Sequence, residues 1–109
     1  MGWIDCHIHL EQYPVEQLDR SIDTWREAGI AGVVAVSTDL ASSYRTLELA
    51  QRYPDFVYPA VGYHPEQVLP STREIEELLS LIKLERASIV AVGEVGLPYY
   101  LKIVDLLPY

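Results

Sequence analysis

The sequence predicts an α/β fold of parallel strand–helix units with about four strands. Apolar runs of strand length alternate along the 109-residue chain with longer segments in which apolar residues recur every three or four positions. Polar residues follow three of these runs, as they do at the carboxyl ends of parallel strands. Such units form either an open sheet or the first half of an eight-stranded (β/α) barrel, which typically has about 250 residues. We therefore expect residues 1–109 to form one domain of either kind.

The composition is that of an ordinary globular chain, with 50% hydrophobic and 22% charged residues. The net charge is −8, from 8 basic and 16 acidic residues. This charge disfavours a simple DNA-binding module, which usually has a basic face, but it allows a metal-dependent enzyme that acts on phosphate esters. The single cysteine excludes an internal disulfide, and we see neither a signal peptide nor an apolar run that would span a membrane. We expect a cytoplasmic protein without a membrane partner.

The first predicted strand, residues 3–10, carries two histidines. Side chains alternate between the two faces of a strand. One face then holds Asp5, His7 and His9, and the other holds Ile4, Cys6 and Ile8. Imidazoles two residues apart have their roots roughly 6–7 Å apart, which lets both reach one ion. We expect Cys6 to be a small core residue on the face that the helices cover.

Two helices and a buried strand follow. Pro14 begins the first helix and Gly29 ends it. Its apolar stripe is Val15, Leu18, Ile22 and Trp25. Residues 30–36 are apolar throughout, which is typical of a parallel strand buried on both faces. Residues 37–39 supply a cap for the second helix. The apolar stripe of that helix is Leu40, Tyr44, Leu47 and Ala50.

Two strands flank the third helix. Residues 56–61 form the third strand, in which Pro59 lacks a ladder N–H, so we expect a bend or irregular pairing there. Ser71, followed three residues later by Glu74, predicts the capping box of the third helix. Its apolar stripe is Ile75, Leu78, Leu79 and Ile82. Residues 88–93 form the fourth strand.

Candidate site residues gather at the carboxyl ends of three strands. His7 and His9 end the first strand, His64 follows the third, and Glu94 follows the fourth between two glycines. Because these ends share one edge of a parallel sheet, we predict that His7, His9 and Glu94 bind a divalent ion with open positions, such as zinc, manganese or iron. Such an ion lowers the pKa of a bound water and polarises a scissile oxygen. The alternative is that all three are ordinary polar residues at exposed strand ends.

Other residues near these ends are open to two interpretations. His64 either donates a hydrogen bond or a proton to a substrate, or only stabilises its own turn. Asp5 is expected to hydrogen-bond behind the metal ligands and not to bind the ion. Tyr63, Tyr99 and Tyr100 either line a substrate cleft or pack as ordinary aromatic residues.

Three segments resemble signatures of the TatD family of metal-dependent hydrolases. They are Ile-Asp-Cys-His-Ile-His-Leu at 4–10, Val-Gly-Tyr-His-Pro-Glu at 61–66 and Gly-Glu-Val-Gly-Leu at 93–97, in the family's order and at similar spacing. The resemblance implies a TIM-barrel fold, of which residues 1–109 would form one truncated (β/α) barrel-type hydrolase domain, and one or two divalent metals, namely zinc, manganese or magnesium. It also implies hydrolysis of phosphodiester bonds in DNA, with exonuclease activity in several members.

The same resemblance implies roles for single residues. His7 and His9 would bind the first metal, and Glu94 would bridge both metals. His64 would lie near the substrate phosphate, so that His64 and Glu94 are the expected catalytic residues. Pro98 departs from the family pattern, because an aspartate commonly stands there.

The family's second half supplies two further histidines and an aspartate, which this chain does not contain. We therefore expect very low activity from this chain alone. Uncovered edges at the first and fourth strands would invite self-association. The alternative functions are thus an inactive, oligomerising half barrel that at most binds metal, and another amidohydrolase-type activity on an ester or lactone.

Overall fold

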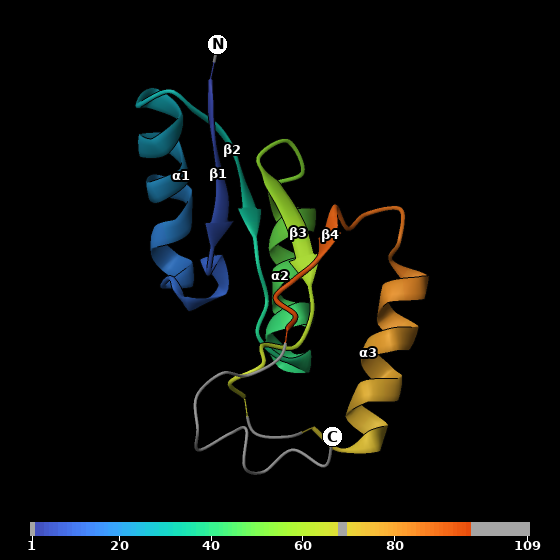
Figure 1. Cartoon of the computed structure of the whole chain (residues 1–109). Coiled ribbons are helices and arrows are strands. Elements are labelled where there is room, and N and C mark those ends of the chain that lie inside the picture. Colours follow the sequence, from blue (N-terminus) through green and yellow to red (C-terminus); the bar gives the residue numbers. More distant parts are fainter. Residues whose placement is uncertain (1, 68–69, 97–109) are drawn as a thin grey trace.

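A four-stranded parallel sheet with the order β1-β2-β3-β4 organises the molecule (Figure 1). The computed structural model describes residues 2–67 and 70–96, so Pro98, Tyr99 and Tyr100 lie outside the described residues. The strands are β1 (Trp3–Ile8), β2 (Ile30–Ala35), β3 (Val57–Val61) and β4 (Ala91–Val92). This order confirms the predicted parallel α/β fold and puts β1 and β4 at the edges of the sheet.

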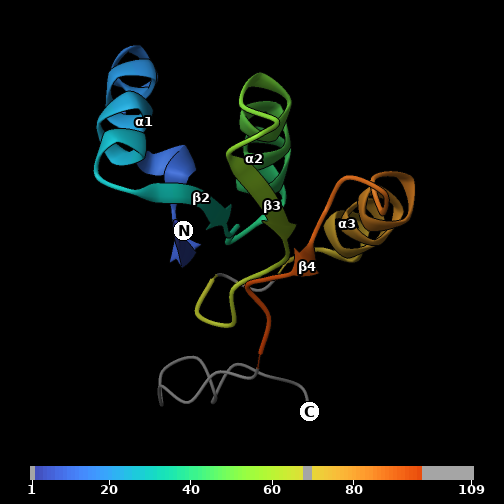
Figure 2. The same ribbon diagram turned by 90° about the horizontal axis from the view of Figure 1, so that it is seen from above.

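Helices cover the outer side of a curled sheet (Figure 2). The α-helices are α1 (Leu18–Glu27), α2 (Leu40–Arg52) and α3 (Thr72–Leu84), and two 3-10 turns are η1 (Leu10–Gln12) and η2 (Val15–Gln17). A curled parallel sheet with its helices outside is the geometry of a (β/α) barrel wall. Within residues 2–67 and 70–96, every helix is too short or too polar to traverse a lipid bilayer.

The helix boundaries have local chemical causes. Gly29 follows α1 with a φ of 98°, in the left-handed region that favours glycine. Asp39 caps α2, because its carboxylate accepts the Ser42 N–H while the Ser42 hydroxyl accepts the Asp39 N–H. Ser71 caps α3 by accepting the Glu74 N–H at 3.1 Å. The predicted N-caps of α2 and α3 are therefore confirmed, since each depends on residues close in sequence, but the Ser71 bond is only one half of the capping box predicted for α3.

The main hydrophobic core lies between the centre of the sheet and the first two helices. Its buried members are Leu10, Leu18, Ile22, Val33, Ala35, Leu49, Phe56 and Val57. A smaller cluster joins α2, β3 and α3 and consists of Leu47, Val61 and Leu81. The main core holds both β2 and β3, and the smaller cluster holds the end of β3 again, so the carboxyl ends of these two strands are the best fixed points near the site.

The buried face of α2 differs from the predicted stripe. Its buried residues are Ser43, Thr46, Leu47 and Leu49. Tyr44, which the stripe included, is 43% exposed and donates a hydrogen bond to Glu77 of α3 at 2.7 Å. Ser43 and Thr46 are buried because their hydroxyls have partners, Gly62 and Ser37 respectively. Polar residues with partners thus occupy places where the apolar period predicted none.

The third helix buries less than its stripe predicted. Leu78 and Leu81 are buried, whereas Ile75 and Leu79 are 44% and 55% exposed. The helix lies beside β4 (Figure 1), which is only two residues long although six were predicted. A short edge strand offers little surface, so two apolar residues of α3 stay exposed.

Pro59 causes no irregular pairing, contrary to expectation. It lies opposite Ala35 in the regular β2–β3 ladder, and its carbonyl accepts the Val90 N–H at 2.9 Å. The N–H and C=O of one residue point to the same side of a strand, so the missing donor faces the segment before β4. No hydrogen bond to β2 is lost.

The first strand is exposed along most of its length. It ends at Ile8 and not at residue 10, because Leu10 begins η1. Trp3 is 77% exposed, and Cys6 is exposed too, so the prediction that Cys6 is a core residue is wrong. The cause is the edge position of β1, since α1 packs mainly against β2.

Candidate metal centre

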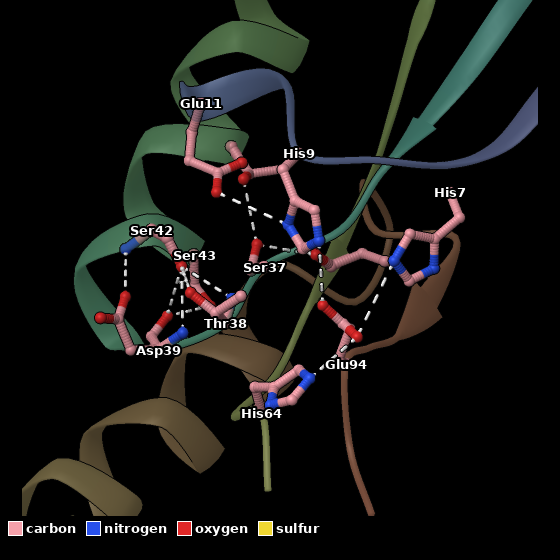
Figure 3. Close-up of polar contacts among 12 residues, drawn as sticks. His7, His9, Glu11, Ser37, Thr38, Asp39, Ser42, Ser43, His64 and Glu94 are labelled. Carbon is pink, nitrogen blue, oxygen red and sulfur yellow. Dashed lines mark hydrogen bonds and ion pairs between the residues drawn. The ribbon is translucent and has the colours of Figure 1, made fainter. Parts of the chain in front are cut away.

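The structure brings four predicted site residues together at the carboxyl end of the sheet (Figure 3). His7 lies near the end of β1 and His9 directly after it, while His64 follows β3 and Glu94 follows β4. Parallel strands place all their carboxyl ends on one edge, which explains how residues 87 positions apart in the sequence become neighbours.

Two histidines converge on one carboxylate. Nε2 of His9 lies 3.3 Å from Oε2 of Glu94, and Nε2 of His7 lies 3.8 Å from Oε1 of the same residue. The two imidazole rings stand edge to face, with centroids 5.2 Å apart. One ligand atom from each of the three residues lies within 4.8 Å of the others. Two imidazole nitrogens and a carboxylate oxygen are a donor set that fits zinc and related divalent ions.

An irregularity in β1 sets the direction of His7. Asp5 pairs with Val33 and Ile8 with Ala35, so three steps on β1 face two on β2. Such a bulge re-aims the side chains beside it. Asp5 lies outside the three-residue group and is exposed, and its Oδ1 accepts the backbone N–H of His7 at 3.0 Å. It therefore contacts a candidate ligand through the backbone, in a more exposed position than predicted.

The backbone of Glu94 is held by the ends of the two middle strands. Its N–H donates to the Ser37 carbonyl at 2.7 Å, and the Gly93 N–H donates to the Val61 carbonyl at 2.9 Å. A Cβ on Gly62 would lie 2.3 Å from the Glu94 carbonyl oxygen, closer than real Cβ contacts. Glycine at 62 is thus what lets Glu94 cross the end of β3 at this distance.

His64 is fixed by its own loop and by the segment between β2 and α2, and it points at Glu94 (Figure 3). Its backbone N–H donates to the Thr38 carbonyl at 2.8 Å, and its Nδ1 accepts the Glu66 N–H at 3.0 Å. A neutral imidazole whose Nδ1 accepts carries its proton on Nε2. That Nε2 lies 3.4 Å from Oε1 of Glu94. His64 therefore stabilises its turn and also presents an N–H donor, so the two alternatives for it are compatible.

Sequence reasoning missed Glu11. This residue of η1 has a side chain that is only 6% exposed, and its Oε1 lies 3.8 Å from Nδ1 of His9. Burial raises the pKa of the Glu11 carboxyl and outweighs the opposing effects of its backbone hydrogen bond and of His9. The available signal was an acidic residue two positions after a candidate ligand and directly beyond the predicted strand.

The surroundings of the histidine pair leave room for a ligand. An open hollow of about 540 Å³ borders His7 and His9, and Tyr13 and Pro14 form part of its wall. Tyr63, one of the predicted cleft residues, is half-buried, and this burial raises the pKa of its phenol.

The fold and these side chains define a class of protein. A curled parallel α/β sheet with potential metal ligands on its carboxyl end is the arrangement of barrel enzymes that work through their strand ends. A family model described as TatD related DNase matches residues 4–105. The chain belongs to the TatD family.

Relatives in this family are clearly similar over nearly the whole chain. A metal-dependent hydrolase of Haemophilus influenzae, named as uncharacterised, is 42% identical over an alignment of 109 positions that covers 96% of this chain and 42% of that protein. Human deoxyribonuclease TATDN3 is 30% identical, with 91% of this chain and 39% of the relative covered. The crystal structure of YJJV, a TatD homologue from Escherichia coli, matches with a TM-score of 0.74 and 31% identity, covering 90% of this chain and 38% of that one. The chain thus spans about two fifths of the length of these relatives.

Proposed function

We propose that this chain carries the metal site of a TatD-type hydrolase that cleaves phosphodiester bonds in DNA. The observation that supports this most is the convergence of His7, His9 and Glu94, whose ligand atoms lie within 4.8 Å of one another. The name of the human relative, a deoxyribonuclease, supports the choice of substrate.

Each residue has a role in this proposal. His7 and His9 offer imidazole nitrogens to a divalent ion, and Glu94 offers two carboxylate oxygens, which suits a second ion as well. A divalent ion held there supplies Lewis acidity and a water that loses its proton near neutral pH. His64 points an Nε2–H at the same place, where it would donate a hydrogen bond to a phosphate oxygen or a proton to the leaving group.

Positive charge at the site is needed because the chain is acidic. A net charge of −8 repels a phosphate backbone. Divalent ions next to Glu94 reverse the local sign of the charge, and a protein that relies on them needs no basic face. DNA binding is therefore expected to require the ion, and it should disappear when a chelator is added.

Calorimetric titration with zinc and with manganese tests the metal site. The intact chain should bind at least one of these ions stoichiometrically, and a His7→Ala/His9→Ala variant should not. Glu76→Gln, which removes one negative charge from an exposed position on α3, is the matched control and should bind as the intact chain does. Absence of binding by the intact chain would contradict the proposal.

Cleavage of end-labelled DNA tests the reaction. We expect slow cleavage that needs manganese, stops with a chelator and falls by about a hundredfold or more in His64→Ala. His64→Ala should still bind the ion, because His64 lies outside the three-residue group. Loss of ion binding in this variant would mean that His64 acts as a ligand.

The exposed edges of the sheet favour a second candidate, self-association. Strands β1 and β4 end the described sheet, and Ile4 and Val92 on them are 49% and 50% exposed. Unpaired strand edges pair readily with another chain. Sedimentation analysis should then show a dimer or larger species whose fraction rises with concentration, and a single monomeric species would count against it.

A further inference from the structure

The side chain of Glu11 is only 6% exposed and lies beside His9, on the side of the ring away from Glu94 (Figure 3). It lies in η1, which Leu10 fixes to the core with no exposed surface. Two backbone hydrogen bonds close this turn, from Gln12 to His9 at 3.1 Å and from Tyr13 to Leu10 at 3.1 Å. The turn also packs against α2. Little freedom is left for the Glu11 backbone, so its side chain is directed by the fold.

The imidazole of His9 lies between two carboxylates. Its Nε2 is 3.3 Å from Oε2 of Glu94, and its Nδ1 is 3.8 Å from Oε1 of Glu11. The His9 side chain is 32% exposed, compared with 57% for His7. His9 is therefore the more enclosed of the two histidines, and it has an acidic partner on each side.

Each residue of this pair has a buried polar atom without a hydrogen-bond partner. Among the described residues, Nδ1 of His9 is buried without a hydrogen-bond partner, and so are Oε2 of Glu94 and Oε2 of Glu11, the carboxylate oxygen next to the one that faces Nδ1. A buried polar group without a partner costs free energy, and a buried carboxylate costs more. A small rotation of the Glu11 side chain would close the 3.8 Å gap and satisfy His9 Nδ1 and the Glu11 carboxylate together.

We infer that Glu11 is a positioning residue that accepts the Nδ1–H of His9 and so leaves the Nε2 lone pair free toward Glu94. The inference rests on the proposed function, in which Nε2 is the atom that meets the divalent ion. A neutral imidazole carries one proton, and a hydrogen bond to one nitrogen selects the other as the ligand atom. The carboxylate also orients the ring and makes Nε2 a better donor of electrons.

Zinc titration of two matched variants tests this role. Glu11→Gln keeps the size of the side chain and removes its charge, and it should bind zinc about 10–100-fold more weakly than the intact chain. Glu16→Gln removes the same charge from the exposed turn η2 and should bind within about twofold of the intact chain. Equal affinity of Glu11→Gln and the intact chain would overturn the inference.

Nitrogen NMR of the histidine rings gives a readout that does not need the ion. In the ion-free chain at about pH 8, the neutral imidazole of His9 should carry its proton on Nδ1. In Glu11→Gln this preference should weaken, while the urea midpoint should not fall, because a neutral amide is easier to bury than a carboxylate. A proton on Nε2 of His9 in the intact chain would overturn the inference.

Zinc titration and histidine NMR together distinguish a failure of the proposed metal site from a failure of the proposed role of Glu11. Failure of the intact chain to bind zinc would contradict the proposed function, whereas the position of the His9 proton still tests Glu11 in the same sample. A lower urea midpoint in Glu11→Gln, together with an unchanged ring proton, would mean that Glu11 only stabilises the turn and would also overturn the inference.

Discussion

The two middle strands and the two edge strands of the sheet are held very differently. On β2 and β3, Val33, Val57 and Val61 are at most 2% exposed, whereas Trp3 on β1 and Val92 on β4 are 77% and 50% exposed. The candidate metal ligands nevertheless come from the edges, from β1 and the residues directly after it and after β4. The buried strands of the sheet are thus β2 and β3, whereas the candidate metal ligands lie at the ends of the exposed strands β1 and β4.

This difference shows how exposed residues gain a defined geometry. Glu94 is bonded through its backbone to Ser37, which follows β2 and is fully buried. His9 is followed by Leu10, which belongs to the core. The edge residues therefore depend on the centre for their positions, and changes in the two regions should have different consequences.

The largest effect on stability is expected from removing a large side chain from the buried centre of the molecule. Phe56 has no exposed surface, so Phe56→Ala should lower the free energy of unfolding by about 3–5 kcal/mol. Trp3→Ala removes a larger side chain that is 77% exposed and should change it by less than about 0.5 kcal/mol. Urea denaturation measures both, and Phe56→Leu gives a graded loss if the alanine variant is unfolded in water. Similar losses for Phe56→Ala and Trp3→Ala would show that the exposed edge strand stabilises the fold as much as the buried centre does.

Substitution of Gly62, which lies between the end of β3 and Glu94, should weaken ion binding and lower the stability of the fold together. A Cβ at Gly62 would lie 2.3 Å from the Glu94 carbonyl, so Gly62→Ala must move one of the two segments. We expect ion binding at least about tenfold weaker and a loss of about 1–3 kcal/mol of stability, as for other overpacked sites.

Gly96→Ala is the matched control, because its Cβ would meet Pro65 at 3.6 Å, an ordinary contact. It should bind the ion as the intact chain does. If calorimetry gives the same affinity for both glycine variants, the close approach of Gly62 to Glu94 does not determine the site.

The buried hydroxyl of Ser37 can be removed without changing the backbone carbonyl that accepts the Glu94 N–H. The Ser37 hydroxyl donates to the Ala60 carbonyl at 2.8 Å and lies 3.0 Å from the Thr46 hydroxyl, and both side chains are fully buried. Ser37→Ala leaves these partners unpaired and should cost about 1–2 kcal/mol, a fall in Tm of about 4–8 °C for each kcal/mol.

Thr46→Val should cost less, because the Ser37–Ala60 hydrogen bond survives. Ion affinity should stay close to that of the intact chain in both variants, since Glu94 is bonded to the Ser37 backbone and not to its hydroxyl. A large loss of affinity with an unchanged Tm would show that the Ser37 side chain acts on the site directly.

The sequence predicted most of the fold because its signals are local. The caps at Asp39 and Ser71 act over three residues, and the apolar run of β2 is continuous. The convergence of His7, His9 and Glu94 also followed, because strand order decides which residues share the carboxyl end.

What the sequence did not predict depends on contacts between distant elements. The exposure of Cys6 follows from α1 lying against β2, and nothing near residue 6 indicates it. The rotated face of α2 follows from hydroxyl partners on other elements, such as Ser37 for Thr46. Glu11 was missed because its importance comes from a turn that folds it back onto His9.

The smallest effect is expected at an exposed contact between helices. The Tyr53 hydroxyl donates to the Asp19 carboxylate and so links the end of α2 to α1. Burial, followed by this hydrogen bond, raises the pKa of the Tyr53 phenol above its ordinary value. The folded chain therefore favours the neutral phenol, and this contribution to stability is present below the ordinary tyrosine pKa of about 10 and is lost as the pH rises through the raised value.

Tyr53→Phe should thus cost less than about 1 kcal/mol at neutral pH, and the difference from the intact chain should shrink in alkaline solution. Urea denaturation at a series of pH values measures this. In an Asp19→Asn background the same substitution should cost less, because the acceptor has lost its charge. A difference that grows with pH would contradict this prediction, because it would mean that the folded chain favours the phenolate form of Tyr53.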